Sequence, residues 1–150
     1  MKKKWKIILS AFVVAILFLI GTFIFYPEWF FPGTSSTYAE TIETNWGLVI
    51  PDPAEETLIK NEREFHGDGE TITELHYEKS NDIQSIRNLS NSWISGGKFE
   101  VTKKELPNWI NDLIKKVEKE ANYFYLKKDR NDYIIFELKG NKVTVYESYI

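Results

Sequence analysis

An unbroken run of uncharged residues, from Ile7 to Tyr26, constrains this chain more than any other feature. An α-helix rises about 1.5 Å per residue, so a helix of this length spans the roughly 30 Å hydrocarbon core of a bilayer. The polar side chains Ser10 and Thr22 can bond carbonyls of the same helix. The sequence therefore predicts a transmembrane helix over residues 7–26.

The charges on either side of this run predict its orientation. Four lysines precede it: Lys2, Lys3, Lys4 and Lys6. The first charge after it is Glu28. Because positively charged flanks stay inside, we expect residues 1–6 to form a cytoplasmic tail and the C-terminal domain to be extracellular. Tyr26 and Trp29 are aromatic residues suited to the outer headgroup level, and Ile7 begins the span on the inner side.

A cleaved signal peptide is the alternative for this segment. Its apolar region is normally about 7–15 residues and is closely followed by a small-x-small site. Here the run is longer, and bulky aromatics with Pro27 and Pro32 come next, so that weak sites occur only after Ser35 or Ala39. We therefore expect an uncleaved anchor. The chain has no cysteine, which excludes lipid attachment through cysteine and disulfide bonds.

Composition divides the rest of the chain into a linker and a domain. Residues 27–44 are partly small and polar and predict a linker, whereas residues 45–150 predict one exported domain. Tyr38–Asp82 holds 12 acidic and 3 basic residues, and Ile83–Ile150 holds 9 acidic and 12 basic ones. An acidic exported domain disfavours nucleic acid as a partner, although a negative charge also simply keeps a domain soluble.

Alternation of apolar and polar residues predicts a hairpin. In Thr71–Glu78, Leu75 and Tyr77 fall on one face, which we expect to be buried. Thr57–Phe65 is less regular, and its start also fits a helix; as a strand it would pair with that segment across residues 66–70.

The C-terminal third is rich in aromatic and β-branched residues. Runs at residues 123–128, 133–139 and 142–150 predict a three-stranded meander. Gly140-Asn141 separates the last two runs, and a glycine in first position is typical of a type II′ turn.

Two segments between the hairpin and the meander have helical spacing. The first starts at Asn81 and stops at the glycine pair 96–97. The second starts at Thr102 with an irregular first turn at Pro107, or else at Leu106, and carries an apolar stripe as far as Ala121. Together these elements predict an α+β fold, with the two helices packed on one face of an antiparallel sheet.

One stretch, "EFHGDGETITELHYE", gathers residue types that bind metals. Its candidate ligands are His66, Asp68, Glu70 and His76. Residues two apart on a strand share a face, and zinc accepts histidine together with carboxylates. However, Gly67 and Gly69 interrupt strand geometry, and Asp-Gly is a hairpin-turn sequence. We therefore favour a turn, with no catalytic residue and no cofactor.

The sequence gives little sign of any other catalytic or ligand-binding function. The chain has no motif for nucleophilic catalysis, phosphate binding, dinucleotide binding or nucleic-acid binding. Aromatic residues make up 15% of it, about twice the ordinary share. We expect Trp46, Trp93 and Trp109 to fill the core; exposed aromatics would instead mark a binding face.

The lysine-led anchor, "GLVIPDP" (Gly47–Pro53) and "FHGDGETI" (Phe65–Ile72) together resemble small membrane-anchored proteins of Gram-positive bacteria that share an HGDG-like turn. The resemblance implies an envelope setting but no activity. We expect a membrane-anchored extracytoplasmic binding or accessory domain, such as a sensor or immunity-type protein, with a protein partner in the envelope and the bilayer contacted through residues 7–26. The alternative is a metal-dependent hydrolase that uses His66, Asp68, Glu70 and His76.

Overall fold

The computed structural model describes residues 12–16, 18–22, 37–63, 68–128 and 131–149. The chain divides into two compact units, Met1–Thr37 and Tyr38–Ile150, which are considered separately.

Within the first unit, residues 12–16 and 18–22 are helical. Of the helices that can be described, none combines the length and the apolar character needed to cross a membrane. Ile7, Tyr26 and Trp29, at the ends of the predicted span and just beyond it, lie outside the described residues. The transmembrane helix therefore stays a prediction.

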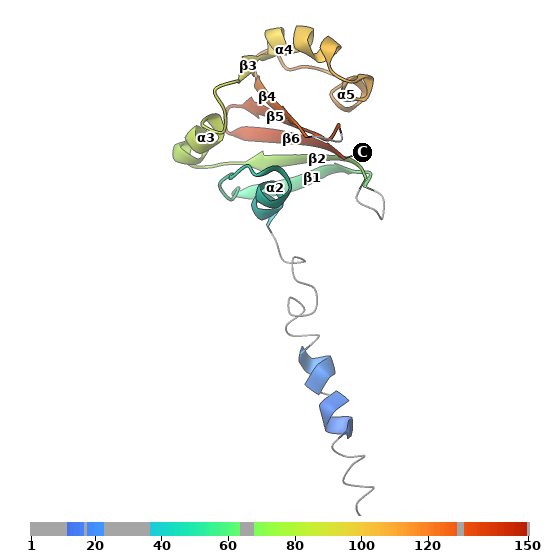
Figure 1. Cartoon of the computed structure of the whole chain (residues 1–150). Helices are drawn as coiled ribbons and strands as arrows, with labels where there is room; N and C mark the ends of the chain where they lie inside the picture. The colour runs from blue at the N-terminus through green and yellow to red at the C-terminus, as the bar shows by residue number, and fades with distance from the viewer. Residues whose placement is uncertain (1–11, 17, 23–36, 64–67, 129–130, 150) are drawn as a thin grey trace, which may run out of the picture. The chain divides into compact units, whose positions relative to one another are not determined.

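The second unit is built around a six-stranded antiparallel sheet in the order β1-β2-β6-β5-β4-β3 (Figure 1). Its strands are β1 (Glu55–Asn61), β2 (Gly69–His76), β3 (Ile94–Ser95), β4 (Asn122–Lys127), β5 (Tyr133–Lys139) and β6 (Lys142–Tyr149). The predicted α+β class, hairpin and meander are confirmed, because β1 pairs with β2 and β5 pairs with both β4 and β6. Strand β2 joins the two parts by pairing with β6, with Thr73 opposite Val145.

The turns follow from local sequence. The backbone N–H of Glu62 donates to the carbonyl of Glu70 at 2.9 Å and extends the β1–β2 pairing towards the loop, of which residues 64–67 are not described. Between β5 and β6, Gly140 has a φ of 62°, which fits the glycine of a type II′ turn.

The helices lie on both faces of the sheet, so the prediction that they share one face is wrong. They are α2 (Tyr38–Trp46), α3 (Ser80–Arg87), α4 (Gly96–Thr102) and α5 (Asn108–Leu113), with a 3₁₀ turn η2 (Lys103–Glu105) after α4. One core cluster joins Ile42 of α2 and Ile86 of α3 to Phe136 of β5. The other joins Phe99 of α4 and Ile110 of α5 to Ile135. Successive residues of β5 point to opposite faces, and its consecutive apolar residues therefore need cover on both.

The domain begins at Tyr38 rather than at the predicted residue 45. Residues 38–44, predicted as part of the linker, belong to α2. Its buried residues Ala39, Ile42 and Trp46 recur at helical spacing, and they place one face of α2 on the sheet.

The predicted helix boundaries are also wrong. Helix α3 ends at Arg87, and the glycine pair predicted to stop it begins α4. The second predicted helix divides into η2 and α5 because Pro107 cannot donate a backbone hydrogen bond and takes an extended ψ of 144°. Residues after α5, as far as Ala121, are not helical.

Candidate functional site

The carboxylate of Glu147 is a deeply buried acidic group in the domain. It lies on the same face of β6 as Val143 and Val145, and only 1% of the residue is exposed. A buried carboxylate is costly unless hydrogen-bond donors replace the water that it loses.

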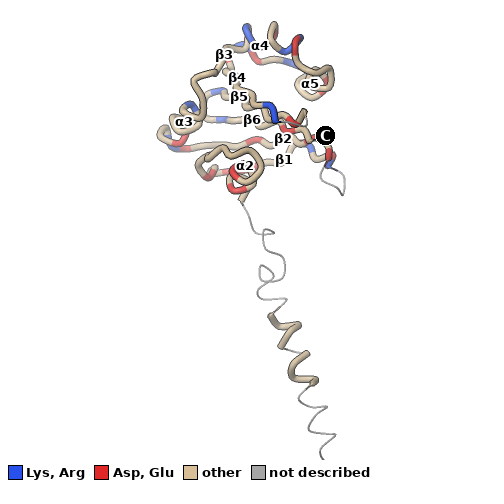
Figure 2. Tube along the Cα trace, in the orientation of Figure 1, with Lys and Arg blue, Asp and Glu red and all other residues tan. Residues whose placement is uncertain are grey.

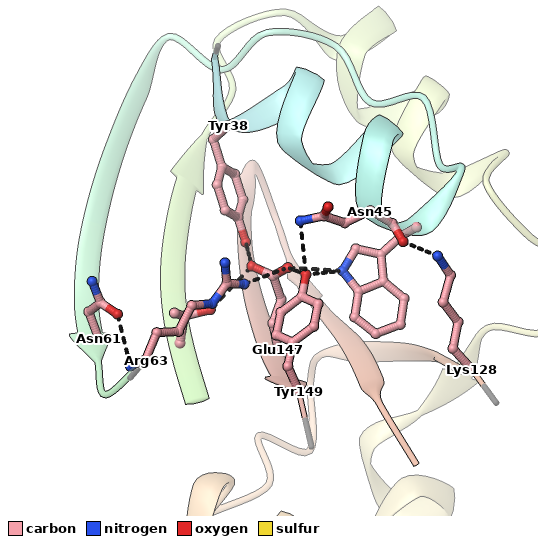
Figure 3. Close-up of polar contacts among 9 residues, drawn as sticks. Tyr38, Asn45, Asn61, Arg63, Lys128, Glu147 and Tyr149 are labelled. Carbon is pink, nitrogen blue, oxygen red and sulfur yellow. Dashed lines mark hydrogen bonds and ion pairs between the residues drawn. The ribbon is translucent and has the colours of Figure 1, made fainter. Parts of the chain in front are cut away.

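Donors from three elements surround this carboxylate (Figure 3). Tyr38 on α2 donates its hydroxyl to Oε2 at 2.8 Å, and Thr71 on β2 does so at 3.2 Å. At Oε1, the Trp46 indole N–H donates at 2.9 Å and the Tyr149 hydroxyl at 2.6 Å. Helix α2 is therefore fixed to the sheet by both of its ends.

Arg63 supplies the counter-charge. It lies just after β1, with Nη2 3.4 Å from Oε1 of Glu147, and its guanidinium stacks at 4.2 Å from the centre of the Tyr149 ring. Its Nε is buried and has no hydrogen-bond partner among the described residues. The ion pair thus ties the end of β1 to the same carboxylate that holds α2.

The tyrosines of this network stay protonated. Burial, followed by the charge of Glu147, raises the pKa of Tyr38 well above its ordinary value, and the same causes raise the pKa of Tyr149. Both hydroxyls are therefore permanent donors at neutral pH. We call Tyr38, Trp46, Arg63, Thr71, Glu147 and Tyr149 the Glu147 network. Because both oxygens of the Glu147 carboxylate are already bonded by side chains of the protein, we interpret this network as a structural clamp rather than a reactive centre.

The four residues proposed from sequence as ligands do not form one site in the described structure. His66 lies in the segment that is not described, and Asp68 directly precedes β2. Glu70 and His76 lie at opposite ends of β2, and six residues of a strand correspond to roughly 20 Å. Within the described ranges, no three His, Asp or Glu side chains are placed to hold a metal ion.

Each of the two described strand residues has its own local partner. Glu70 accepts from Lys60 at 2.7 Å across the hairpin. His76 lies opposite Glu55, and its Nε2 is 3.2 Å from Nδ2 of Asn141. Together with Thr57 and Glu74, Glu55 and His76 line a small polar hollow beside β1.

Strand β1 forms one long edge of the sheet (Figure 1). Six of its seven residues are exposed, including Leu58 at 55% and Ile59 at 58%. A bulge interrupts its pairing between Leu58 and Lys60. The opposite edge, β3, has only two residues. Sequence reasoning missed this edge because strand order depends on pairing between distant segments.

Comparisons with known proteins give no further guide. No protein-family model, curated protein or solved structure matches the chain.

Proposed function

We propose that this chain is a single-pass membrane protein with a cytoplasmic N-terminus, whose exported α+β domain acts by binding another protein rather than by catalysis. The exposed length of β1 is the observation that carries the proposal. An edge strand presents unpaired N–H and C=O groups, and proteins bind extended segments by adding them to such an edge.

The Glu147 network supports this proposal by making the edge rigid. Arg63 holds the C-terminal end of β1 to Glu147, and the Ala54 N–H donates to the carbonyl of His76 at 2.9 Å near the other end. A strand held at both ends loses little conformational freedom when it binds, and this favours affinity.

The membrane part of the proposal is supported by sequence alone. The uncharged run over residues 7–26 and the lysines before it predict the anchor and its direction. Protease added to intact protoplasts is expected to remove an epitope placed after Ile150 and to spare one placed before Met1. Protection of the C-terminal epitope would contradict the topology.

Site-directed photo-crosslinking in cells tests the binding function. A photoreactive residue replaces Leu58 on β1 in the full chain, and a matched control replaces Val101, which is 63% exposed on α4. We expect a discrete protein adduct from position 58 and none from position 101. Equal labelling from both positions, or from neither, would contradict binding at the edge.

The metal-dependent hydrolase is tested in parallel by a zinc titration followed by thermal shift. The described geometry supplies no specific support for it. If zinc raises the melting temperature of the protein but not that of the His66→Ala and His76→Ala variants, the result would support the metal-dependent hydrolase instead.

A further inference from the structure

We propose that the β1 edge binds one extended polypeptide segment carrying lysine or arginine side chains, which adds to the sheet as a further strand. This inference rests on the binding function proposed above and specifies the chemistry of the partner. In the described sheet, the other edge strand, β3, spans only two residues, so β1 is the edge long enough for strand addition.

The charge on this edge is acidic and unneutralised. Glu55 and Glu56, at the start of β1, are exposed and have no ion-pair partner among the described residues. The one basic residue of the strand, Lys60, is already held by Glu62 at 2.8 Å and Glu70 at 2.7 Å. A cationic segment beside β1 would therefore meet free carboxylates.

The hollow next to the start of β1 extends this acidic surface. Glu55, Glu74 and His76 line it, and Lys142 approaches Glu74 at 2.9 Å from the neighbouring side. Figure 2 also shows acidic residues on α2, which packs with Leu75 on the opposite face of the sheet and is therefore not part of the hollow. A long lysine or arginine side chain on an added strand reaches the hollow from the open side of β1, where no basic residue of β1 competes.

A second copy of this chain fits the edge less well. Its β1 would bring the same glutamates, and its Lys60 is already engaged within its own hairpin. The bulge between Leu58 and Lys60, like the charges, is a feature by which natural sheets prevent unselective pairing of edges. Pairing of β1 with β1 of a second copy is therefore disfavoured, and pairing with a positively charged strand is favoured.

The test uses the full chain in lipid nanodiscs and two synthetic peptides of alternating valine and threonine. One peptide has lysines at both ends, and the other has glutamates there. At low salt we expect the lysine peptide to bind roughly tenfold more tightly and to slow amide hydrogen exchange in β1, with a preference that shrinks as salt is added. A proline at the centre of the lysine peptide is expected to abolish the protection of β1.

Matched variants identify the carboxylates responsible. The double variant Glu55→Gln, Glu56→Gln is expected to remove most of the preference for the lysine peptide. Glu100→Gln, at an exposed position on α4, is expected to leave it unchanged.

Three results would overturn the inference. They are equal binding of the two peptides, protection outside β1, and a concentration-dependent dimer that protects β1 without any peptide. If any of these occurs while the crosslink from position 58 persists, the binding function stands and only the cationic partner is wrong. Loss of that crosslink as well would remove both proposals.

Discussion

Trp46 on α2 donates its indole N–H to the carboxylate of Glu147 on β6, at 2.9 Å and across 101 positions of sequence. The bond joins the first element of the domain to its last strand. Because Arg63 approaches the same carboxylate, one side chain connects α2, the end of β1 and the sheet.

Replacing Glu147 by glutamine is expected to lower the free energy of unfolding by about 2 kcal/mol. Glutamine keeps the volume, but it has one acceptor oxygen in place of two and leaves Arg63 without a counter-charge. Urea denaturation of the variant measures the loss. Glu100→Gln on α4 is the control and should change stability by less than about 0.5 kcal/mol; an equal effect of both would contradict the clamp.

Coupling between α2 and the hairpin is expected to pass through Glu147. Trp46→Phe and Arg63→Met each remove one interaction with the carboxylate, and we expect their effects on stability to differ from additivity by about 0.5–1.5 kcal/mol. A double-mutant cycle measures this difference. The control cycle combines Trp46→Phe with Lys142→Met, because Lys142 pairs with Glu74 outside the network. Additivity in the first cycle would show that the two contacts act independently.

Local sequence patterns predicted the strands well. The alternation that placed Leu75 and Tyr77 on a buried face is confirmed, since they are 0% and 1% exposed. The expectation that tryptophans fill the core holds for Trp46, which is buried, whereas Trp93 and Trp109 are only half-buried and pack against the margins of the two core clusters. These features depend on neighbours in sequence, which is why a pattern detects them.

Features that depend on distant contacts escaped prediction. The polar appearance of residues 38–44 concealed α2, although Ala39 and Ile42 have the spacing of a helix face. Glu147 lies two residues after Val145 and four after Val143, so it falls on the same face of the strand. This position was the sequence signal that Glu147 is buried. Its partners come from three other parts of the chain, so the clamp itself had no local signature.

Alkaline pH is expected to destabilise the domain. Burial raises the folded-state pKa of five tyrosines above the ordinary value: Tyr38, Tyr77, Tyr123, Tyr146 and Tyr149. Above about pH 10 the unfolded chain loses these protons while the folded chain keeps them, so the stability that is fully present below that pH is lost as pH rises. A tyrosine that keeps its proton in the folded chain lowers the free energy of unfolding by at most about 1.4 kcal/mol per pH unit, and a partly exposed one such as Tyr149 lowers it by less.

Urea denaturation between about pH 9 and pH 11 checks this slope, and tyrosinate absorbance reports ionisation. Tyr38→Phe should make the decline shallower by one tyrosine's contribution. A stability that stays flat over this range would contradict the burial of these hydroxyls.

Gly96 is expected to tolerate no side chain. A Cβ at this position would lie 2.1 Å from the carbonyl oxygen of Glu118, a backbone atom that cannot rotate away, and the Gly96 N–H also donates to Ala121 at 2.9 Å. Gly96→Ala should therefore force the start of α4 away from the segment before β4, at a cost of about 2–3 kcal/mol in urea denaturation. Gly97 is the matched control, because a Cβ there would meet nothing within 4 Å beyond its own helix backbone. Gly97→Ala should be neutral or stabilise α4 by up to about 1 kcal/mol, and equal losses in the two variants would contradict the close approach at Gly96.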